Sequence, residues 1–451
     1  VGRDSGRSAL VALLSLAAAG TSVFSVRDAR RSLFGGMFVH DGFTVFFTLL
    51  FCAVGAAAVL QSWDYVKRTR INHGEYYALL LSATLGMILM AASSDLITIF
   101  LGLELMSLAL YVLVGFRRTR LDSSEAALKY FLLGAFASGF LLYGIALLYG
   151  ATGTTNLGTM GMFLAGSPLS DNPMLLMGGL LVLAGLGFKV AAVPFHMWTP
   201  DAYEGAPTTV TGFMSAGAKA AGFAGLLRVV LTALGGLQAE WRPLLIWVAI
   251  LTMTLGNVTA LLQTNLKRML AYSSIAHAGY LLVAVAAGGP EGGSAALFYL
   301  AVYSVMNLGA FGVLALLGRE QEERVRLSDL AGLGARHPAL ALAMTLFMLS
   351  LGGIPPTAGF MGKVYVFSVA VKAGLVPLVI VGVLNSVVSI FYYLRVTVAM
   401  YMQEPQGEPV EIAWAAPAIL AVLAMAALTL WWGVQAHGLL EQAQRSIVGL
   451  L

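Results

Sequence analysis

Thirteen stretches of about 20 mainly apolar residues follow one another along this chain. They cover residues 8–24, 41–62, 75–93, 95–116, 123–150, 173–196, 207–234, 242–263, 266–287, 295–317, 338–372, 376–402 and 413–434. A helix of this length crosses the hydrocarbon core of a bilayer. Residues of the AVILMFWYC group make up 59% of the chain and charged residues only 11%, which fits a lipid environment and not a water-soluble domain. We predict an all-α polytopic membrane protein with about 13 transmembrane helices.

Basic residues are unevenly shared between the two ends of these spans. If the crossings alternate, the loops on the N-terminal side (side one) hold fourteen lysines and arginines, and those on the opposite side (side two) hold six. Cytoplasmic loops carry such an excess, so side one is predicted to be cytoplasmic and the C-terminus periplasmic. The net charge of +4 is assigned to topology, and no nucleic-acid partner is expected. The single cysteine, Cys52, excludes a disulfide framework or a thiolate-ligated iron–sulfur cluster within this chain.

Two spans contain residues that interrupt helices, GLGFKVAAVP at 185–194 and SLGGIPPTAG at 350–359. Each is the fourth span in a set of five, at 75–234 and at 242–402. A repeat with an odd number of crossings returns with the opposite orientation, so the pattern predicts two inverted five-helix repeats, each with a broken fourth helix. N-terminal helices at 1–74 would precede the repeats, and a C-terminal helix and tail at 403–451 would follow them.

Five ionisable residues lie deep inside these spans: Glu104, Lys189, Lys219, His277 and Lys363. A charge at mid-bilayer costs at least about 2.5–3.5 kcal/mol on insertion scales, which favours a functional role. A buried lysine near a carboxylate can change its charge when that partner moves. We predict a proton relay in which Glu104 sets the charge state of Lys189 and Lys219 connects towards Lys363, with His277 titrating along the way. Two alternatives to these relay roles remain. The long lysine side chains could reach the membrane surface, and His277 could be a hydrogen-bonded residue of the helix packing with no role in proton transfer.

Three further cations, Lys129, Arg228 and Arg395, lie nearer to the ends of their spans. We interpret them mainly as interfacial anchors. Six scattered histidines show no helical i,i+3 or i,i+4 pair, so no metal site is predicted.

Five segments carry a resemblance to a known family. They are LGLELMSL at 101–108, EAALKYFLLG at 125–134, FKVAAVPFHMWTPDAYEGAP at 188–207, LKRMLAYSSIAHAGY at 266–280 and GGIPPTAGFMGK at 352–363. Together they resemble the antiporter-like membrane subunits of respiratory complex I over nearly the whole chain. In that family Glu104 falls on the glutamate of the fifth helix, and three lysines fall on the basic positions of later helices: Lys189, Lys219 and Lys363.

The resemblance implies a fold of fourteen helices, one more at the N-terminus than counted here. It implies a non-redox subunit of NADH:quinone oxidoreductase in a bacterial inner membrane, which couples electron transfer to proton pumping. Flavin, iron–sulfur clusters, NADH and quinone would be bound by partner subunits of the membrane and peripheral arms, and no cofactor by this chain. The alternatives are a core subunit of an Mrp-type cation/proton antiporter, a hydrogenase-linked membrane arm, and a structural spacer whose buried charges fix helix register.

Overall fold

A computed structural model describes residues 5–27, 29–165, 172–318, 323–405 and 411–450. Within these residues, twelve helices are long and apolar enough to cross a membrane. They are α1 (Ser5–Ser25), α2 (Gly42–Arg68), α3 (Gly74–Ala92), α4 (Leu96–Val114), α5 (Leu121–Thr152), α7 (Pro173–Val190), the continuous helix formed by α9 (Thr208–Phe213), η3 (Met214–Ala218), α10 (Lys219–Arg228) and η4 (Val229–Ala233), α11 (Gln238–Leu261), α12 (Leu266–Ala287), α13 (Gly289–Leu316), α17 (Val376–Met402) and α18 (Ala416–Val434).

The predicted span at 338–372 is two short helices, α15 (Pro338–Gly352) and α16 (Ala358–Lys372). Fifteen residues rise only about 22 Å, less than the thickness of the hydrocarbon core, so neither crosses a bilayer alone. The prediction of a helical polytopic membrane protein is confirmed, and the number thirteen stays a prediction. The remaining regular elements are β1 (Arg31–Leu33), η1 (Phe34–Gly36), β2 (Phe38–His40), α6 (Leu157–Leu164), α8 (Trp198–Gly205), η5 (Gly235–Leu237), η6 (Leu327–Leu330), α14 (Leu333–Arg336) and α19 (His437–Val448).

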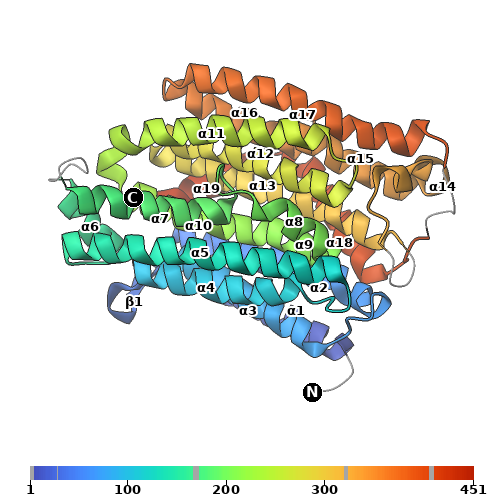
Figure 1. The fold of residues 1–451 in the computed structure, drawn as a ribbon, viewed down its shortest axis with the longest axis horizontal. Helices are drawn as coiled ribbons and strands as arrows, with labels where there is room; N and C mark the ends of the chain where they lie inside the picture. Colours follow the sequence, from blue (N-terminus) through green and yellow to red (C-terminus); the bar gives the residue numbers. More distant parts are fainter. Residues whose placement is uncertain (1–4, 28, 166–171, 319–322, 406–410, 451) are drawn as a thin grey trace.

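The long helices lie side by side with α13 in the middle of the bundle (Figure 1). Helices α3, α4 and α5 form one flank, and α11, α16 and α17 form the opposite one. Every residue in the most apolar window of α13, and of the helix 208–233, is buried inside the protein, whereas only 17% of that window in α1 is. The N-terminus lies toward the end of the bundle that carries α14, and the C-terminus lies at the end that carries α6. The helices that hold Lys219 and His277, residues 208–233 and α12, are therefore among the most enclosed, whereas the corresponding windows of α4 and α7 are 61% and 50% buried.

Polar residues at the ends of the apolar stretches set where several helices begin. The Asp41 carboxylate accepts a hydrogen bond from the Thr44 amide at 2.8 Å, and Asp95 does the same for Ile97 at 2.9 Å. The Asn265 side chain accepts from the first amides of α12. Each cap satisfies an amide that has no partner within its own helix, a requirement that is stricter near lipid than in water.

Small residues allow neighbouring helices to pack closely. A Cβ atom added at Gly86 of α3 would lie 2.5 Å from the backbone nitrogen of Met106 on α4. Apolar side chains gain little by leaving lipid for a protein interior, so membrane helices associate largely through such close van der Waals contact. This contact holds α4, and Glu104 with it, against α3.

The two helix breaks have the same backbone geometry. At the end of α7, Ala191 has a φ of 61°, and the Ala192 amide bonds to the Gly187 carbonyl at 2.9 Å. At the end of α15, Gly353 has a φ of 81°, and the Ile354 amide bonds to the Leu349 carbonyl at 3.0 Å. Both are Schellman-type endings, in which a left-handed residue redirects the chain and the last carbonyls still find donors.

Candidate functional site

Lys189 lies in the last turn of α7, one residue before the first break. Its side chain is only 4% exposed, and its ammonium has no hydrogen-bond partner among the described residues. The nitrogen lies 5.2 Å from the ring centre of Tyr130 and 5.5 Å from that of Tyr111. Cation–π attraction to these rings offsets part of the cost of burying a charge. Because the Lys189 ammonium is buried among these rings, the alternative in which it extends to the membrane surface is excluded.

Glu104 lies near this lysine without forming an ion pair with it. Its carboxylate accepts a hydrogen bond from the Ser138 hydroxyl of α5, and the side chain is half-buried. Among the described residues, Glu104 and Lys189 form no ion pair within 4.0 Å, although the two interact electrostatically. The Tyr111 ring is close to both residues. The predicted partners are thus neighbours in space that do not form a direct ion pair.

Lys219 lies in the middle of the bundle, at the start of α10 and directly after the π-helical turn η3. Its ammonium donates to the Val190 carbonyl at 3.2 Å and to the Ser274 carbonyl at 2.9 Å. Val190 is the last residue of α7, so one of these acceptors belongs to the negative end of a helix dipole. Lys219 therefore joins the first broken helix to α12.

His277 lies one turn after Ser274 on α12 and is 1% exposed. One ring nitrogen, Nδ1, lies 2.7 Å from the Tyr299 hydroxyl of α13, and the other, Nε2, lies 3.1 Å from the Tyr393 hydroxyl of α17. In a neutral imidazole one nitrogen donates and the other accepts. Moving a proton through the ring would reverse both hydrogen bonds, so the Tyr–His–Tyr chain can conduct as well as pack.

Lys363 lies near the start of α16, just after the second break. It is 4% exposed, and its ammonium donates to the Gly352 carbonyl and to the Ser386 hydroxyl, both at 2.9 Å. Gly352 is the last residue of α15, so Lys363 binds the end of a broken helix as Lys219 does. Its nitrogen lies 5.1 Å from the Tyr280 ring centre, and that ring lies 5.6 Å from His277.

The five candidate residues therefore follow one path through the bundle. It runs from α4 through α7, α10 and α12 to α16. Contacts with carbonyls and tyrosines link neighbouring members, and the three lysines are all at least 96% buried.

A buried ionic cluster escaped the sequence analysis. Glu323, in the loop after α13, pairs with Arg117 at 3.0 Å and with Lys267 at 3.4 Å. It also accepts hydrogen bonds from the Tyr65 hydroxyl and, at 2.7 Å, from the Thr208 hydroxyl. From the sequence, Arg117 and Lys267 are two of the fourteen basic residues assigned to the side-one loops, where exposure to water is expected. Nothing in the sequence near position 323 marks that carboxylate as buried, because the loop 318–337 is rich in charges of both signs.

The interpretation of Arg228 as an interfacial anchor is wrong. Its guanidinium is 4% exposed and pairs with both oxygens of Asp41, at 2.9 and 3.0 Å. It also donates to the Ala91 carbonyl at 2.8 Å. Arg228 therefore ties α10 to α2 and α3 inside the bundle. Lys129 is instead half-exposed and pairs with Glu125 and Asp201, as suits a residue near the surface.

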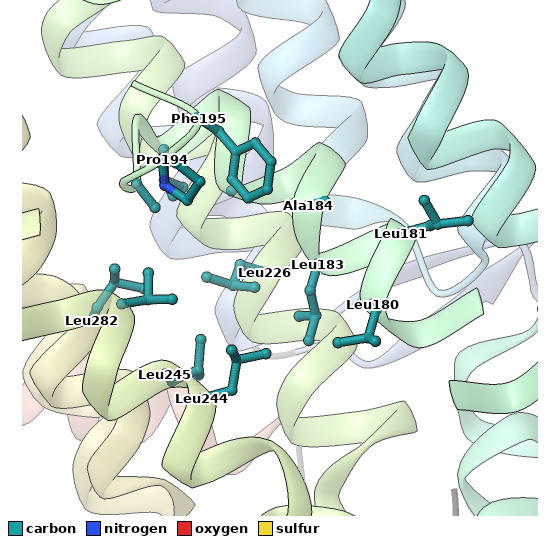
Figure 2. Close-up of a pocket in the computed structure, with 14 residues that line it drawn as sticks. Leu180, Leu181, Leu183, Ala184, Pro194, Phe195, Leu226, Leu244, Leu245 and Leu282 are labelled. Atoms are coloured by element: carbon teal, nitrogen blue, oxygen red, sulfur yellow. The ribbon is translucent and has the colours of Figure 1, made fainter. Parts of the chain in front are cut away.

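A groove beside the first break is apolar. It has a volume of about 380 Å³ and runs between α7 and α11, with Leu226 and Leu282 among its lining residues (Figure 2). Its fourteen lining residues are all apolar, so it offers no group that could bind a charged ligand or carry a proton. None of the five candidate residues lines this groove.

Comparison with known proteins agrees with this geometry. Residues 93–389 match the family described as the NADH:quinone oxidoreductase/Mrp antiporter transmembrane family. NADH-quinone oxidoreductase subunit N of Trichlorobacter lovleyi is 51% identical over 445 residues, which cover 99% of this chain and 91% of that protein.

Two solved structures have the same fold. A chain of respiratory complex I from Thermus thermophilus with bound aureothin is 38% identical, with a TM-score of 0.83 and coverage of 97% of this chain and 94% of that one. A chain of the Mrp complex from a Dietzia species has a TM-score of 0.88 over 99% of this chain and 93% of its own, but at 22% identity it shows only a shared fold. The resemblance found in the sequence motifs is confirmed, and the chain belongs to the NADH:quinone oxidoreductase/Mrp antiporter family, among the NADH-quinone oxidoreductase subunit N proteins.

Proposed function

We propose that this chain is the proton-translocating membrane subunit of an NADH:quinone oxidoreductase in a bacterial inner membrane. The main support is the path of buried bases from Lys189 to Lys363, in a chain about half identical to subunit N proteins. Flavin, iron–sulfur clusters, NADH and quinone belong to partner subunits in this proposal, and the present chain performs no redox chemistry. Its C-terminus is assigned to the periplasm from the excess of basic residues on side one.

We further propose that residues 75–234 and 242–402 form two inverted repeats. The matched Schellman-type endings at Ala191 and Gly353 support this division. So do the two lysines that bind the final carbonyl of a broken helix, Lys219 at Val190 and Lys363 at Gly352. Broken helices in matching positions of two halves are typical of transport sites.

The proposed cycle begins at Glu104 and Lys189. A conformational signal from neighbouring subunits brings the carboxylate toward the ammonium or releases it, which favours or disfavours the charged lysine. Lys189 then exchanges a proton toward Lys219, whose acceptor Val190 is the next residue of α7. The proton continues through His277 and its tyrosine partners to Lys363. Moving one charge against 100 mV requires about 2.3 kcal/mol, which small changes in such buried contacts can supply.

Reconstitution of the whole complex tests the function directly. In proteoliposomes, NADH and quinone should drive proton uptake by a complex that contains this chain, and an uncoupler should collapse the gradient. The chain alone should show neither redox activity nor cation/proton exchange. Sodium/proton exchange by the isolated chain would support the Mrp-type alternative instead.

Glu104→Gln should shift the pH dependence of turnover in the assembled complex. The amide keeps the shape of the side chain and its contact with Ser138, but removes the negative charge that favours protonated Lys189. We therefore expect the decline in activity at alkaline pH to begin at a lower pH. The rate of NADH oxidation, measured from pH 6 to 10, reports the shift.

Glu75→Gln is the matched control for Glu104→Gln, because Glu75 is an exposed carboxylate in the first turn of α3. Its pH profile should match that of the wild type. Identical profiles for all three proteins, with normal assembly, would reduce Glu104 to a packing role.

A further inference from the structure

A basic pocket lies where two helix pairs turn at side one. The turn between α2 and α3 contributes residues 69–73 to it, and the turn between α4 and α5 contributes residues 116–120. Its volume is about 480 Å³. The lining residues, which we call the arginine pocket, are Thr69, Arg70, Ile71, His73, Phe116, Arg117, Arg118, Thr119 and Arg120. Four arginines and a histidine line it, and no carboxylate does.

One of these arginines presents a buried donor that has no partner. Arg117 is 6% exposed, and one of its terminal nitrogens pairs with Glu323 at 3.0 Å. The other, Nη2, is buried and makes no hydrogen bond among the described residues. An unsatisfied buried donor costs about 1–3 kcal/mol, and more when it is charged, so the site gains by accepting an anionic oxygen.

Acidic side chains compensate two of the pocket's arginines, Arg117 and Arg120, but not Arg118. The Arg120 guanidinium pairs with Asp122 at 2.9 Å, whereas Arg118 is exposed and makes no hydrogen bond or ion pair within the described residues. The His73 and Phe116 rings pack 6.2 Å apart, and the Phe116 ring gives the pocket an apolar wall. Tyr65 lies beneath Arg117, with 5.8 Å from guanidinium carbon to ring centre, and helps to fix its orientation.

From this geometry we infer that the arginine pocket binds the headgroup phosphate of an anionic phospholipid. Guanidinium groups bind phosphate through paired N–H donors. Both turns lie where membrane helices end, which is the depth of lipid headgroups, and each basic residue near an anionic membrane surface contributes about 1 kcal/mol. The apolar wall suits the glycerol and first methylenes of a lipid.

Such a lipid would be linked to the proton path. Arg117 also holds Glu323, and Glu323 holds Lys267 at the first turn of α12. His277 lies on the same helix. A phosphate bound to Nη2 of Arg117 would hold the guanidinium in place without breaking its ion pair with Glu323. Because Glu323 in turn binds Lys267, a lipid in the pocket would stabilise the first turn of α12.

The test uses the whole complex with wild-type chain, with Arg118→Gln, and with Arg336→Gln as control. Arg336 is an exposed side-one arginine on α14, outside the pocket. Turnover is measured in phosphatidylcholine vesicles with increasing mole fractions of phosphatidylglycerol. We expect Arg118→Gln to need about fivefold more phosphatidylglycerol for half-maximal activation, the equivalent of roughly 1 kcal/mol. The control should follow the wild type, and Arg118→Lys should restore most of the response.

A second measurement counts phosphatidylglycerol that stays bound to the detergent-purified complex. The wild type and Arg336→Gln should retain more than Arg118→Gln does. Equal retention and equal activation curves for all variants would overturn the inference. Full activation by inorganic phosphate in pure phosphatidylcholine vesicles would overturn the lipid assignment, as would activation by a soluble acidic partner protein.

Discussion

Lys219→Ala should abolish redox-driven proton pumping in a complex that still assembles. The ammonium is the only charged group that contacts both the end of α7 and α12 in the described chain, through Val190 and Ser274. Without the Lys219 ammonium, a proton must pass between α7 and α12 with no basic group to hold it. A charge at this depth in the membrane raises the free energy by at least about 2.5–3.5 kcal/mol. That barrier lowers the rate of transfer at least about 50-fold. Proton uptake into proteoliposomes, measured with NADH and quinone, gives the result.

Lys372→Ala is the control for Lys219→Ala. Lys372 is a 68% exposed lysine at the end of α16, paired with Glu291 on the surface. Its loss should leave pumping within error of the wild type. An unchanged proton-to-electron ratio in Lys219→Ala would remove this lysine from the relay. If Lys219→Ala reduces the amount of assembled complex, and the complex that does assemble still pumps normally, the result would support the alternative that the buried charges only fix the register of the helices.

The helices could be predicted well because few backbone conformations are stable in lipid. Backbone groups in hydrocarbon must be bonded within their own segment, so a long apolar stretch becomes a helix. The helix predicted at 123–150 appears as α5, two residues longer at each end, and the one predicted at 376–402 appears as α17 with the same boundaries. The hairpin of β1 and β2 and the short helices α6 and α14 do not follow from the apolar stretches, since they lie at the ends of the bundle, where water removes that constraint (Figure 1).

The depth of the site residues could be predicted, but not their contacts. Apolar neighbours place Lys189, Lys219 and Lys363 inside the membrane, and the structure buries all three. Which carbonyl each lysine binds depends on how the helices pack. The sequence indicates Glu104 and Lys189 as a possible pair. In the structure Glu104 instead accepts a hydrogen bond from Ser138, and the Lys189 ammonium faces the Tyr111 ring.

Arg228 and Glu323 were missed for a related reason. A charge near the end of a span is usually solvated, and only the tertiary fold brings Asp41 to Arg228, or Lys267 and Arg117 to Glu323. The burial of the candidate lysines could therefore be predicted from sequence, whereas the ionic contacts between the helices could not.

The strongest effect on stability is expected from Glu323→Gln. The substitution leaves Lys267 and Arg117 buried next to each other without a counter-charge, and breaking a buried ion pair in this way costs about 3–5 kcal/mol. We expect a clearly lower unfolding temperature for the purified complex and less assembled complex in the membrane. Glu441→Gln, which removes an exposed partner of Arg445 on α19, is the control and should change neither.

The pH dependence of this difference separates charge from shape. Burial acts to raise the pKa of the Glu323 carboxyl, but Lys267 and Arg117 outweigh it and hold the pKa at about 2, well below the ordinary 4.5. A carboxyl with a lowered pKa in the folded state contributes stability that is fully present above its unfolded pKa and is lost as the pH falls through the folded value. The gap in unfolding temperature between wild type and Glu323→Gln should thus stay constant from pH 8 to about 5, and narrow steadily below about 4.5. A gap that persists unchanged at pH 3 would show that the carboxyl contributes through its shape and hydrogen bonds, and not through its charge.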